Sequence, residues 1–422
     1  MEVSYNLKYE KSNFSNKVIL DKEGEIIIYT KGFRLKGKGA GDKGELINFS
    51  EIKEFYHKGD KIYFVNFNKE KYVLSETGTL FDQLLTDLYK SRNEFLMDAL
   101  FMKGGKLKAE YEGHFNRMSK FARPISKDRA KFRLHESSLI VLPAQQDAFV
   151  VHFNFVNFYE FDDMEYQLKI VMDSGENIFI SQLGNDFEFF QEKFEAILGG
   201  MYQTVVNDVL REAFPHFHAT TLLKLASKMK GGKAVSLHDI EKMDEEMARA
   251  VEDFIYEDEL FKEKAAVLRE KVDKYNTFYG VAQDKAVDGG FVKWIMFAIP
   301  ESNIVAFSIL PRWCQEGENK DHPDFKHFTY FYKIIIEKGS PADKVEDKIH
   351  EINEALVNLK FVKDPCYKDK RELKHSPYQY AIRKLPYLRI LRKSYVGKVG
   401  ASDTKEWHKQ AEELIKKASL QQ

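Results

Sequence analysis

Cysteine is nearly missing from this sequence of 422 residues, which contains only Cys314 and Cys366. Two distant cysteines exclude a disulfide framework and an all-cysteine zinc site, and free thiols are typical of a reducing compartment. Long apolar runs are missing too, because none approaches the ~18 residues of a membrane-spanning helix. The opening MEVSYNLKYEKSNF contains no apolar core of a secretion signal. These absences predict a cytoplasmic protein that does not cross a membrane.

Familiar catalytic motifs are also missing. The sequence has no G-x-S-x-G, no G-x-x-x-x-G-K-[ST] and no H-E-x-x-H. Asp321, His322 and Asp324 stand close together but follow no known metal-ligand spacing, and no activating base can be named for Cys314. We therefore expect no catalytic residue, no metal and no cofactor, although residues 276–422 leave room for an active site without a familiar motif.

Charge is balanced over the whole chain but unevenly distributed along it. Residues 131–275 contain 16 Lys and Arg against 27 Asp and Glu, a net charge of −11. Residues 363–422 contain 15 against 7, a net charge of +8. An acidic middle and a basic end favour recognition of a partner or of another part of the same chain.

The strongest positive signal is an internal duplication at an offset of 106 residues. The segment LINFSEIKEF (46–55) aligns with HFNFVNFYEF (152–161), and the alignment continues without a gap into the residues that follow. Its identical pairs include Asn48 with Asn154, Phe49 with Phe155, Phe55 with Phe161, Val65 with Val171, Gly78 with Gly184 and Phe81 with Phe187. A chance match does not preserve this aromatic spacing, so the sequence predicts two copies of one domain, at 1–105 and 106–215.

Each copy changes from a period of two residues to a helical period. Short alternating segments such as 26–30, 61–66 and 71–75 predict half-buried strands. A helical stripe follows in each copy, formed by Phe81, Leu84, Leu85 and Leu88 in the first and by Phe187, Phe190, Phe194 and Ile197 in the second. Each domain is therefore predicted to end in one amphipathic helix.

About 100 residues of antiparallel strands followed by one helix is the plan of the pleckstrin-homology-like superfold, which both copies resemble. The resemblance covers residues 1–213 and is closest to GRAM-type members. It is carried by an I-x-F-x-x-I-x-x-F strand, a hairpin, a Y/F-x-L/I-S strand and the helix. It implies two tandem β-barrel or sandwich domains, each with a C-terminal helix, that bind proteins or anionic headgroups.

The rest of the chain has a different pattern. Residues 216–275 predict a helical segment, and residues 276–422 mix predicted strands with helices at 342–359 and 404–420. The predicted fold class is α+β, with two pleckstrin-homology-like domains, a helical middle segment and a C-terminal α+β domain. A diverged third copy is an alternative for that last domain, although it shows no match at an offset of 106.

Two basic segments are candidate binding sites. The first is a glycine-rich loop of the first copy, where lysines and backbone N–H groups are suited to an anionic headgroup. Its basic residues are Lys31, Arg34, Lys36, Lys38 and Lys43. The second is a basic and aromatic stretch that suits docking onto acidic residues 131–275, nucleic acid or an anionic membrane. Its basic residues are Arg383, Lys384, Arg389, Arg392 and Lys393.

These features favour binding over catalysis. We expect a scaffold or adaptor that binds a protein partner, or itself, through an open sheet edge or the groove beside a terminal helix. Peripheral binding of anionic phospholipid through the glycine-rich loop is the first alternative. A histone- or nucleic-acid-associated factor is the second, since tandem domains of this superfold occur in histone chaperones. Direct nucleic-acid binding is not expected at a pI of 6.9.

Overall fold

The protein is described from a computed structural model. The described residues are 3–39, 41–257, 259–284, 290–311, 328–334, 343–358, 371, 373, 378–400 and 403–419. They form an α+β fold, which confirms the predicted class. The chain divides into two compact units: unit 1 is Met1–Ile197 with Pro377–Lys384, and unit 2 is Leu198–Ser376 with Leu385–Gln422.

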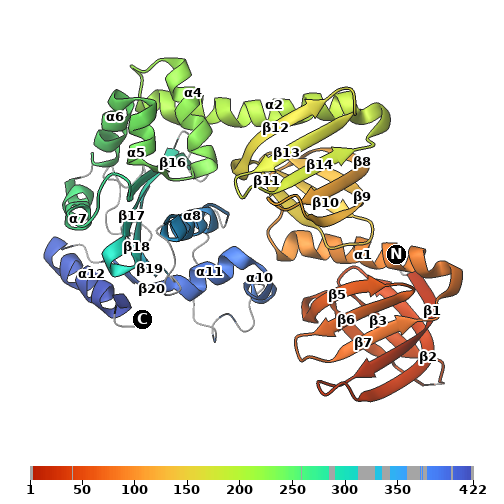
Figure 1. The fold of residues 1–422 in the computed structure, drawn as a ribbon. Coiled ribbons are helices and arrows are strands. Elements are labelled where there is room, and N and C mark those ends of the chain that lie inside the picture. The colour runs from red at the N-terminus through yellow and green to blue at the C-terminus, as the bar shows by residue number, and fades with distance from the viewer. Residues whose placement is uncertain are drawn as a thin grey trace. The chain divides into compact units, whose positions relative to one another are not determined.

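The first copy of the repeat is a seven-stranded antiparallel sheet in the order β4-β3-β2-β1-β7-β6-β5. Its strands are β1 (Val3–Ser12), β2 (Val18–Tyr29), β3 (Gly32–Gly37), β4 (Glu45–Asn48), β5 (Ile52–Lys58), β6 (Lys61–Asn66) and β7 (Lys71–Ser75). Helix α1 (Phe81–Ala99) follows them and lies across one end of the curled sheet (Figure 1).

The second copy has the same order, β11-β10-β9-β8-β14-β13-β12. Its strands are β8 (Leu107–Met118), β9 (Pro124–His135), β10 (Ser138–Pro143), β11 (Phe149–His152), β12 (Val156–Asp162), β13 (Gln167–Met172) and β14 (Asn177–Ser181), followed by helix α2 (Phe187–Val205). Each copy is thus a seven-stranded antiparallel sheet followed by one helix.

Alternation of buried and exposed residues explains both sheets. In the first copy Ile26, Ile28, Phe33 and Leu35 point into one core, where Leu84 and Leu88 of α1 join them. The turn before each helix contains a glycine in the left-handed region, Gly78 at φ 58° and its equivalent at φ 59°. Only glycine adopts that conformation without strain, which is why this pair persists in the duplication.

The gapless alignment is wrong between residues 45 and 58. Strands β4 and β5 begin at Glu45 and Ile52, whereas β11 and β12 begin at Phe149 and Val156, an offset of 104 instead of 106. Phe49 is therefore equivalent to Phe153, which like it begins a short 3-10 turn and is fully buried.

Two length changes cause this shift and then cancel it. The loop between β3 and β4 is two residues shorter in the second copy, and the turn between β5 and β6 is two residues longer. By the same offset Phe55 is equivalent to Tyr159, not to Phe161. The offset of 106 holds for every other strand and for both helices.

Helix α1 is buried on a second side, against the second copy. Arg92 is fully buried, and its Nε and Nη2 donate to the two carboxylate oxygens of Asp147 at 2.5 and 2.8 Å. The side-chain amide of Asn93 donates to the backbone carbonyls of Pro143 and Gln146, and its Oδ1 accepts the Ala148 N–H at 2.8 Å. The helix that ends one domain is thus an integral part of the next.

Unit 2 is a six-stranded antiparallel sheet with helices on both faces. The sheet has the order β15-β16-β17-β18-β19-β20. Its strands are β15 (Val235–Ser236), β16 (Thr277–Asp284), β17 (Gly290–Ile299), β18 (Ile304–Pro311), β19 (Thr329–Lys333) and β20 (Tyr395–Val399). Its helices are α3 (Arg211–Ala213), α4 (Ala219–Lys228), α5 (Leu237–Met243), α6 (Glu245–Ile255), α7 (Glu259–Arg269), α8 (Asp343–Asn358), α11 (Pro386–Ser394) and α12 (Thr404–Ser419).

The expected helical segment is not separate from the C-terminal domain. Apolar residues of α4 to α7 and α12 form one core with Tyr279, Ile295 and Phe331 of the sheet. On the other face the ring of Phe278 lies 6.3 Å from that of His350 in α8, and α11 packs on α8. The described residues of unit 2 form no third copy, because their strand order differs from that of the two repeats. In the described part of the chain no helix is long and apolar enough to cross a membrane.

Removing Asp147 should destabilise unit 1 more than removing Arg92. Asp147→Ala leaves a buried guanidinium without its counterion, which costs about 3 kcal/mol, whereas Arg92→Met leaves a half-exposed carboxylate that water solvates at about 1 kcal/mol. Urea unfolding followed by far-UV circular dichroism measures both.

Tryptophan fluorescence is the internal control for this comparison. All three tryptophans, Trp294, Trp313 and Trp407, belong to unit 2. Their unfolding transition should stay unchanged in both variants. Equal destabilisation by the two substitutions would contradict the asymmetry.

High pH should weaken the attachment of α1 to its own sheet. The Tyr5 hydroxyl donates to Asp87 at 2.5 Å, and burial followed by this hydrogen bond raises the pKa of Tyr5 to about 12. Because the folded pKa is raised, this stabilisation is complete below the unfolded pKa of about 10 and is lost as the pH rises through about 12. Tyr5→Phe should lower the free energy of unfolding by about 1 kcal/mol at neutral pH. Between about pH 10 and 12 the free energy of unfolding of this variant should fall less steeply than that of the wild type. Denaturant midpoints at pH 7, 10 and 12 check this, and parallel curves for the two proteins would disprove it.

Candidate binding surfaces

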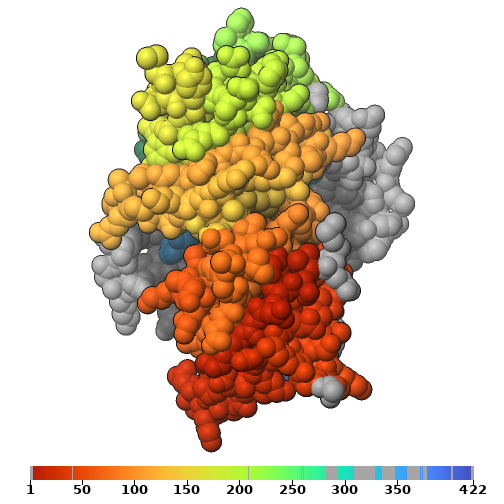
Figure 2. All heavy atoms as spheres, turned by 90° about the vertical axis from the view of Figure 1, so that its right-hand side faces the viewer, coloured from red at the N-terminus to blue at the C-terminus, as the bar shows by residue number. Residues whose placement is uncertain are grey.

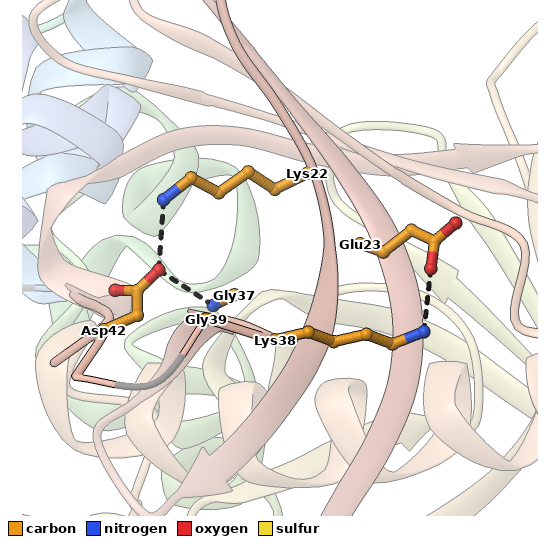
Figure 3. Close-up of a pocket in the computed structure, with 6 residues that line it drawn as sticks. All are labelled: Lys22, Glu23, Gly37, Lys38, Gly39 and Asp42. Atoms are coloured by element: carbon orange, nitrogen blue, oxygen red, sulfur yellow. Dashed lines mark hydrogen bonds and ion pairs between the residues drawn. The ribbon is translucent and has the colours of Figure 1, made fainter.

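The glycine-rich loop of the first copy borders an open pocket of about 450 Å³ (Figure 3). The lining residues are Lys22, Glu23, Gly37, Lys38, Gly39 and Asp42. Of the five basic residues predicted to bind a headgroup, Lys38 alone lines this pocket. Lys31 lies in the turn between β2 and β3, at the opposite end of β3 from Lys38.

A carboxylate of the protein already occupies the anion-binding groups of this loop. Asp42 Oδ2 accepts from Lys22 Nζ at 3.0 Å and from the Gly37 N–H at 3.2 Å, as Figure 3 shows. Asp42 Oδ1 accepts from the Gly44 N–H at 2.9 Å. The Gly44 N–H and then Lys22 lower the pKa of Asp42, so the group is a stable anion at neutral pH. A phosphate would have to displace this carboxylate.

The other basic side chains of the loop are directed at different partners. Lys38 pairs with Glu23 at 2.7 Å and Lys36 with Glu25 at 3.4 Å. The Arg34 guanidinium lies 5.9 Å from the ring centre of Tyr29. Lys43 is exposed in the loop between β3 and β4. The positive charge that the sequence concentrates here is largely neutralised by neighbouring strands.

The residues of the basic C-terminal stretch belong to two different units. Arg383 and Lys384 are in helix α10 (Gln379–Lys384) of unit 1, while Arg389, Arg392 and Lys393 are in α11 of unit 2. Arg389 and Lys393 are exposed.

Helix α10 docks against the first copy. Its Tyr380 is buried, with its ring 5.0 Å from that of Phe95. The Arg383 guanidinium lies 4.4 Å from the ring centre of Phe67, and Lys384 Nζ donates to the carbonyl of Lys53 in edge strand β5. Burial lowers the pKa of Lys384. Aromatic rings and a strand-edge carbonyl thus hold a basic segment of this chain.

The second copy presents an edge of a different character, which we name the acidic edge. It consists of β12, the turn 163–166 and the first turns of α2. Strand β12 is the last strand of its sheet and, among the residues that the structure describes, pairs with β13 alone. Large apolar side chains are exposed along it, with Phe158 at 51% and Met164 at 90%, together with Tyr166 and Phe189. In Figure 2 the yellow and yellow-green atoms, which belong to the C-terminal half of the second copy and to α2, lie at the surface.

Carboxylates surround these apolar side chains. The exposed acidic residues are Glu160, Asp162, Asp163, Glu165, Asp186, Glu188, Glu192 and Glu195. Within the described part of the chain none of them is paired with a basic side chain. The negative charge of these carboxylates affects two neighbouring tyrosines. Burial, together with Asp186 and Glu192, raises the pKa of Tyr111, and burial together with Glu195 raises the pKa of Tyr159.

The equivalent edge of the first copy lacks this character. Strand β5 contains Lys53, Glu54 and Lys58, and Lys53 and Glu54 pair with one another at 2.8 Å. Sequence analysis predicted an open sheet edge in general terms but did not single out the second copy. The signal was present in the run FYEFDDMEY (158–166), in which apolar residues alternate with four carboxylates and no basic residue.

A buried lysine of unit 2 has a structural role. Lys293 is fully buried, and its Nζ donates to the Phe254 carbonyl at 2.6 Å and to Glu257 at 2.7 Å. Elsewhere, His, Cys, Asp and Glu residues whose positions are described form no group that could hold a metal ion. Cys314 and the segment Asp321–Asp324 lie outside the described residues.

No known protein-family model matches the chain, and no curated protein matches it.

Inorganic phosphate should not enter the glycine-rich loop of the wild-type protein. The amide resonances of Gly37 and Gly44 should be unchanged by millimolar phosphate at pH 7, because Asp42 occupies both N–H groups. Since the pKa of Asp42 is lowered, the loop contacts persist above the unfolded value of about 3.9 and are lost as the pH falls through the folded value. The two amides should therefore shift in acid in the wild type but not in Asp42→Asn. Phosphate-dependent shifts at pH 7 would reverse this assignment.

Proposed function

We propose that this protein is a non-catalytic scaffold that binds a basic segment of a protein partner on the acidic edge of its second copy. The observation that carries the proposal is the combination, at the edge strand β12 and the turn after it, of exposed Phe158, Met164 and Tyr166 with carboxylates that pair with no basic side chain among the described residues. Exposed apolar residues ringed by charge of one sign are typical of interaction sites.

Strand addition supplies the physical mechanism. After Val156, edge strand β12 offers backbone N–H and C=O groups to an extended segment without requiring special side chains. Side chains of an added strand alternate, so one set contacts Phe158 and the next set reaches the carboxylates. A partner segment in which Lys or Arg alternates with apolar residues fits both requirements.

The first copy contains an internal example of the same chemistry. There the chain's own α10 places Lys384 on the carbonyl of Lys53 in β5 and Arg383 on the ring of Phe67. Helix α10 differs from the proposed ligand because it is helical, yet it brings cations and an aromatic ring to an edge strand. The acidic edge offers the corresponding position of the second copy with stronger negative charge.

The same charges disfavour the alternative functions of headgroup binding and direct nucleic-acid binding. Headgroup binding in the glycine-rich loop is disfavoured because Asp42 occupies its donors. Direct nucleic-acid binding at the acidic edge is disfavoured because phosphates would face eight carboxylates. A histone-like partner with a basic tail belongs to the proposed class of partners. Another molecule of the same protein, bound through its basic residues, also belongs to it.

A basic probe peptide should bind, and the acidic edge should be responsible. The probe is a fluorescein-labelled peptide of about ten residues that alternates Lys and Val, and its counterpart alternates Glu and Val. Fluorescence anisotropy should show roughly micromolar binding of the Lys peptide that weakens with salt, and no binding of the Glu peptide. Asp163→Lys with Glu165→Lys should lower the affinity about tenfold.

The matched control reverses a charge in the equivalent turn of the first copy. Asp60→Lys lies in the turn between β5 and β6 and should leave the affinity unchanged. Loss of binding in the control but not in the double variant would assign the peptide to another surface. Equal binding of the two peptides would remove the proposal.

A further inference from the structure

The first hairpin of each copy ends in the same rigid turn. In the first copy the N–H of Asn13 donates to the carbonyl of Lys17 at 3.0 Å, and that of Asn16 to the carbonyl of Asn13 at 2.9 Å. In the second copy Ser119 donates to Arg123, and Ala122 to Ser119, each at 2.9 Å. Each position lies 106 residues from its equivalent.

Different side chains maintain this one shape. The Oδ1 of Asn13 accepts the N–H groups of Ser15 and Lys17, whereas the Oγ of Ser119 accepts that of Arg123. The left-handed residue is Asn16 at φ 59° in one turn and Ala122 at φ 56° in the other. The side chain of alanine makes no local hydrogen bond that would stabilise this backbone conformation. The hydrogen bonds at the strand ends therefore hold the turn in its shape.

Both turns display a phenylalanine to solvent. Phe14 is 76% exposed and Phe121 is 71% exposed. An isoleucine on the following strand, Ile19 or Ile125, is also exposed in each copy, at positions 106 residues apart. Because apolar exposure at both tips contributes nothing to the fold, it indicates a binding role.

The residues of both tips include cations and no carboxylate. Residues 11–20 and 117–127 contain no Asp or Glu. Lys11 and Arg117 at the base of the hairpins pair with glutamates of neighbouring strands. The tip cations Lys17, Lys120, Arg123 and Lys127 are paired with no carboxylate in the part of the chain that the structure describes.

We infer that the two hairpin tips are anchors for an anionic lipid membrane surface, each inserting its phenylalanine between lipid headgroups while the neighbouring cations face the phosphates. Aromatic side chains partition into this interfacial layer, and each nearby cation adds attraction to an anionic leaflet.

The shape of the tips favours a bilayer over a protein partner. A stable protein interface buries about 1,000 Å² or more over complementary surfaces, which a narrow five-residue turn cannot offer. A bilayer deforms around a narrow apolar tip and needs no complementary pocket. This inference uses other residues than the acidic edge and does not depend on the proposed function.

Vesicle binding of the full chain tests the anchors. The wild-type protein should co-sediment with vesicles of phosphatidylcholine and phosphatidylserine and not with phosphatidylcholine alone, and added salt should release it. Phe14→Ser with Phe121→Ser should lower the partition coefficient at least about tenfold, because two apolar anchors are lost. Phe14→Trp with Phe121→Trp should preserve binding and show a blue-shifted emission on the anionic vesicles.

Two control variants change residues outside the hairpin tips. Leu223→Ser removes an exposed apolar residue of α4 and should bind vesicles like the wild type. Lys38→Ala changes the glycine-rich loop and should also bind like the wild type, since headgroup capture there is not the mechanism. Peptide binding by the acidic edge should be unchanged in Phe14→Ser with Phe121→Ser, so the two proposals fail separately.

Three results would overturn the inference. The first is no binding of the wild type to the anionic vesicles at low salt. The second is unchanged binding by the serine double variant, or a loss caused by Lys38→Ala instead. The third is concentration-dependent self-association in sedimentation velocity that the serine variant abolishes while vesicles stay unbound, which would assign the tips to contacts between copies of the chain.

Discussion

Unit 1 depends on a single helix that packs against both copies. The apolar stripe of α1 completes the core of the first copy, and one turn further along the helix Arg92 and Asn93 bind residues of the second copy. A fully buried guanidinium needs a carboxylate, and Asp147 supplies it from a loop of the next domain. The two domains of unit 1 therefore depend on each other for their packing. The equivalent residues of α2 are Leu198 and Gly199, which can form no such ion pair.

The duplication preserves the scaffold and diversifies its surface. Strand order, the left-handed glycine before each helix and the first-hairpin turn recur in both copies. Edge strand β5 has mixed charge and meets the chain's own Lys384, while β12 is acidic and carries exposed Phe158. Backbone hydrogen bonding constrains the first set of features, whereas side chains at the edge can change without cost to the core.

Charge in the sequence and charge on the surface differ for a physical reason. A run of lysines predicts an anion site only if their charge is free, and strands from elsewhere in the chain decide that. Glu23 and Glu25 of β2 pair with Lys38, just after β3, and with Lys36 of β3, and Asp42 fills the glycine-rich loop. At the acidic edge and at the hairpin tips, as far as the described residues extend, no opposite charge pairs with the exposed side chains, so those surfaces keep the character that their residues give them.

Sequence alone was sufficient wherever the controlling pattern is local or repeated. Alternation and helical stripes identified part of β2, strands β6 and β7 and their counterparts in the second copy, and helices α1, α2, α8 and α12, because burial follows the period of each element. Local pattern could not locate the shift between residues 45 and 58, since two length changes in separate loops cancel each other.

Contacts between distant residues were decided only by the tertiary structure. Nothing in the sequence pairs Arg92 with Asp147, assigns α10 to unit 1, or joins the helices of 219–269 to the sheet that follows them. The same is true of the candidate sites, because exposure of Phe14, Phe121 and Phe158 is set by which neighbours fold over them. Composition and periodicity record what each residue prefers, while the packed chain determines which of those preferences are satisfied.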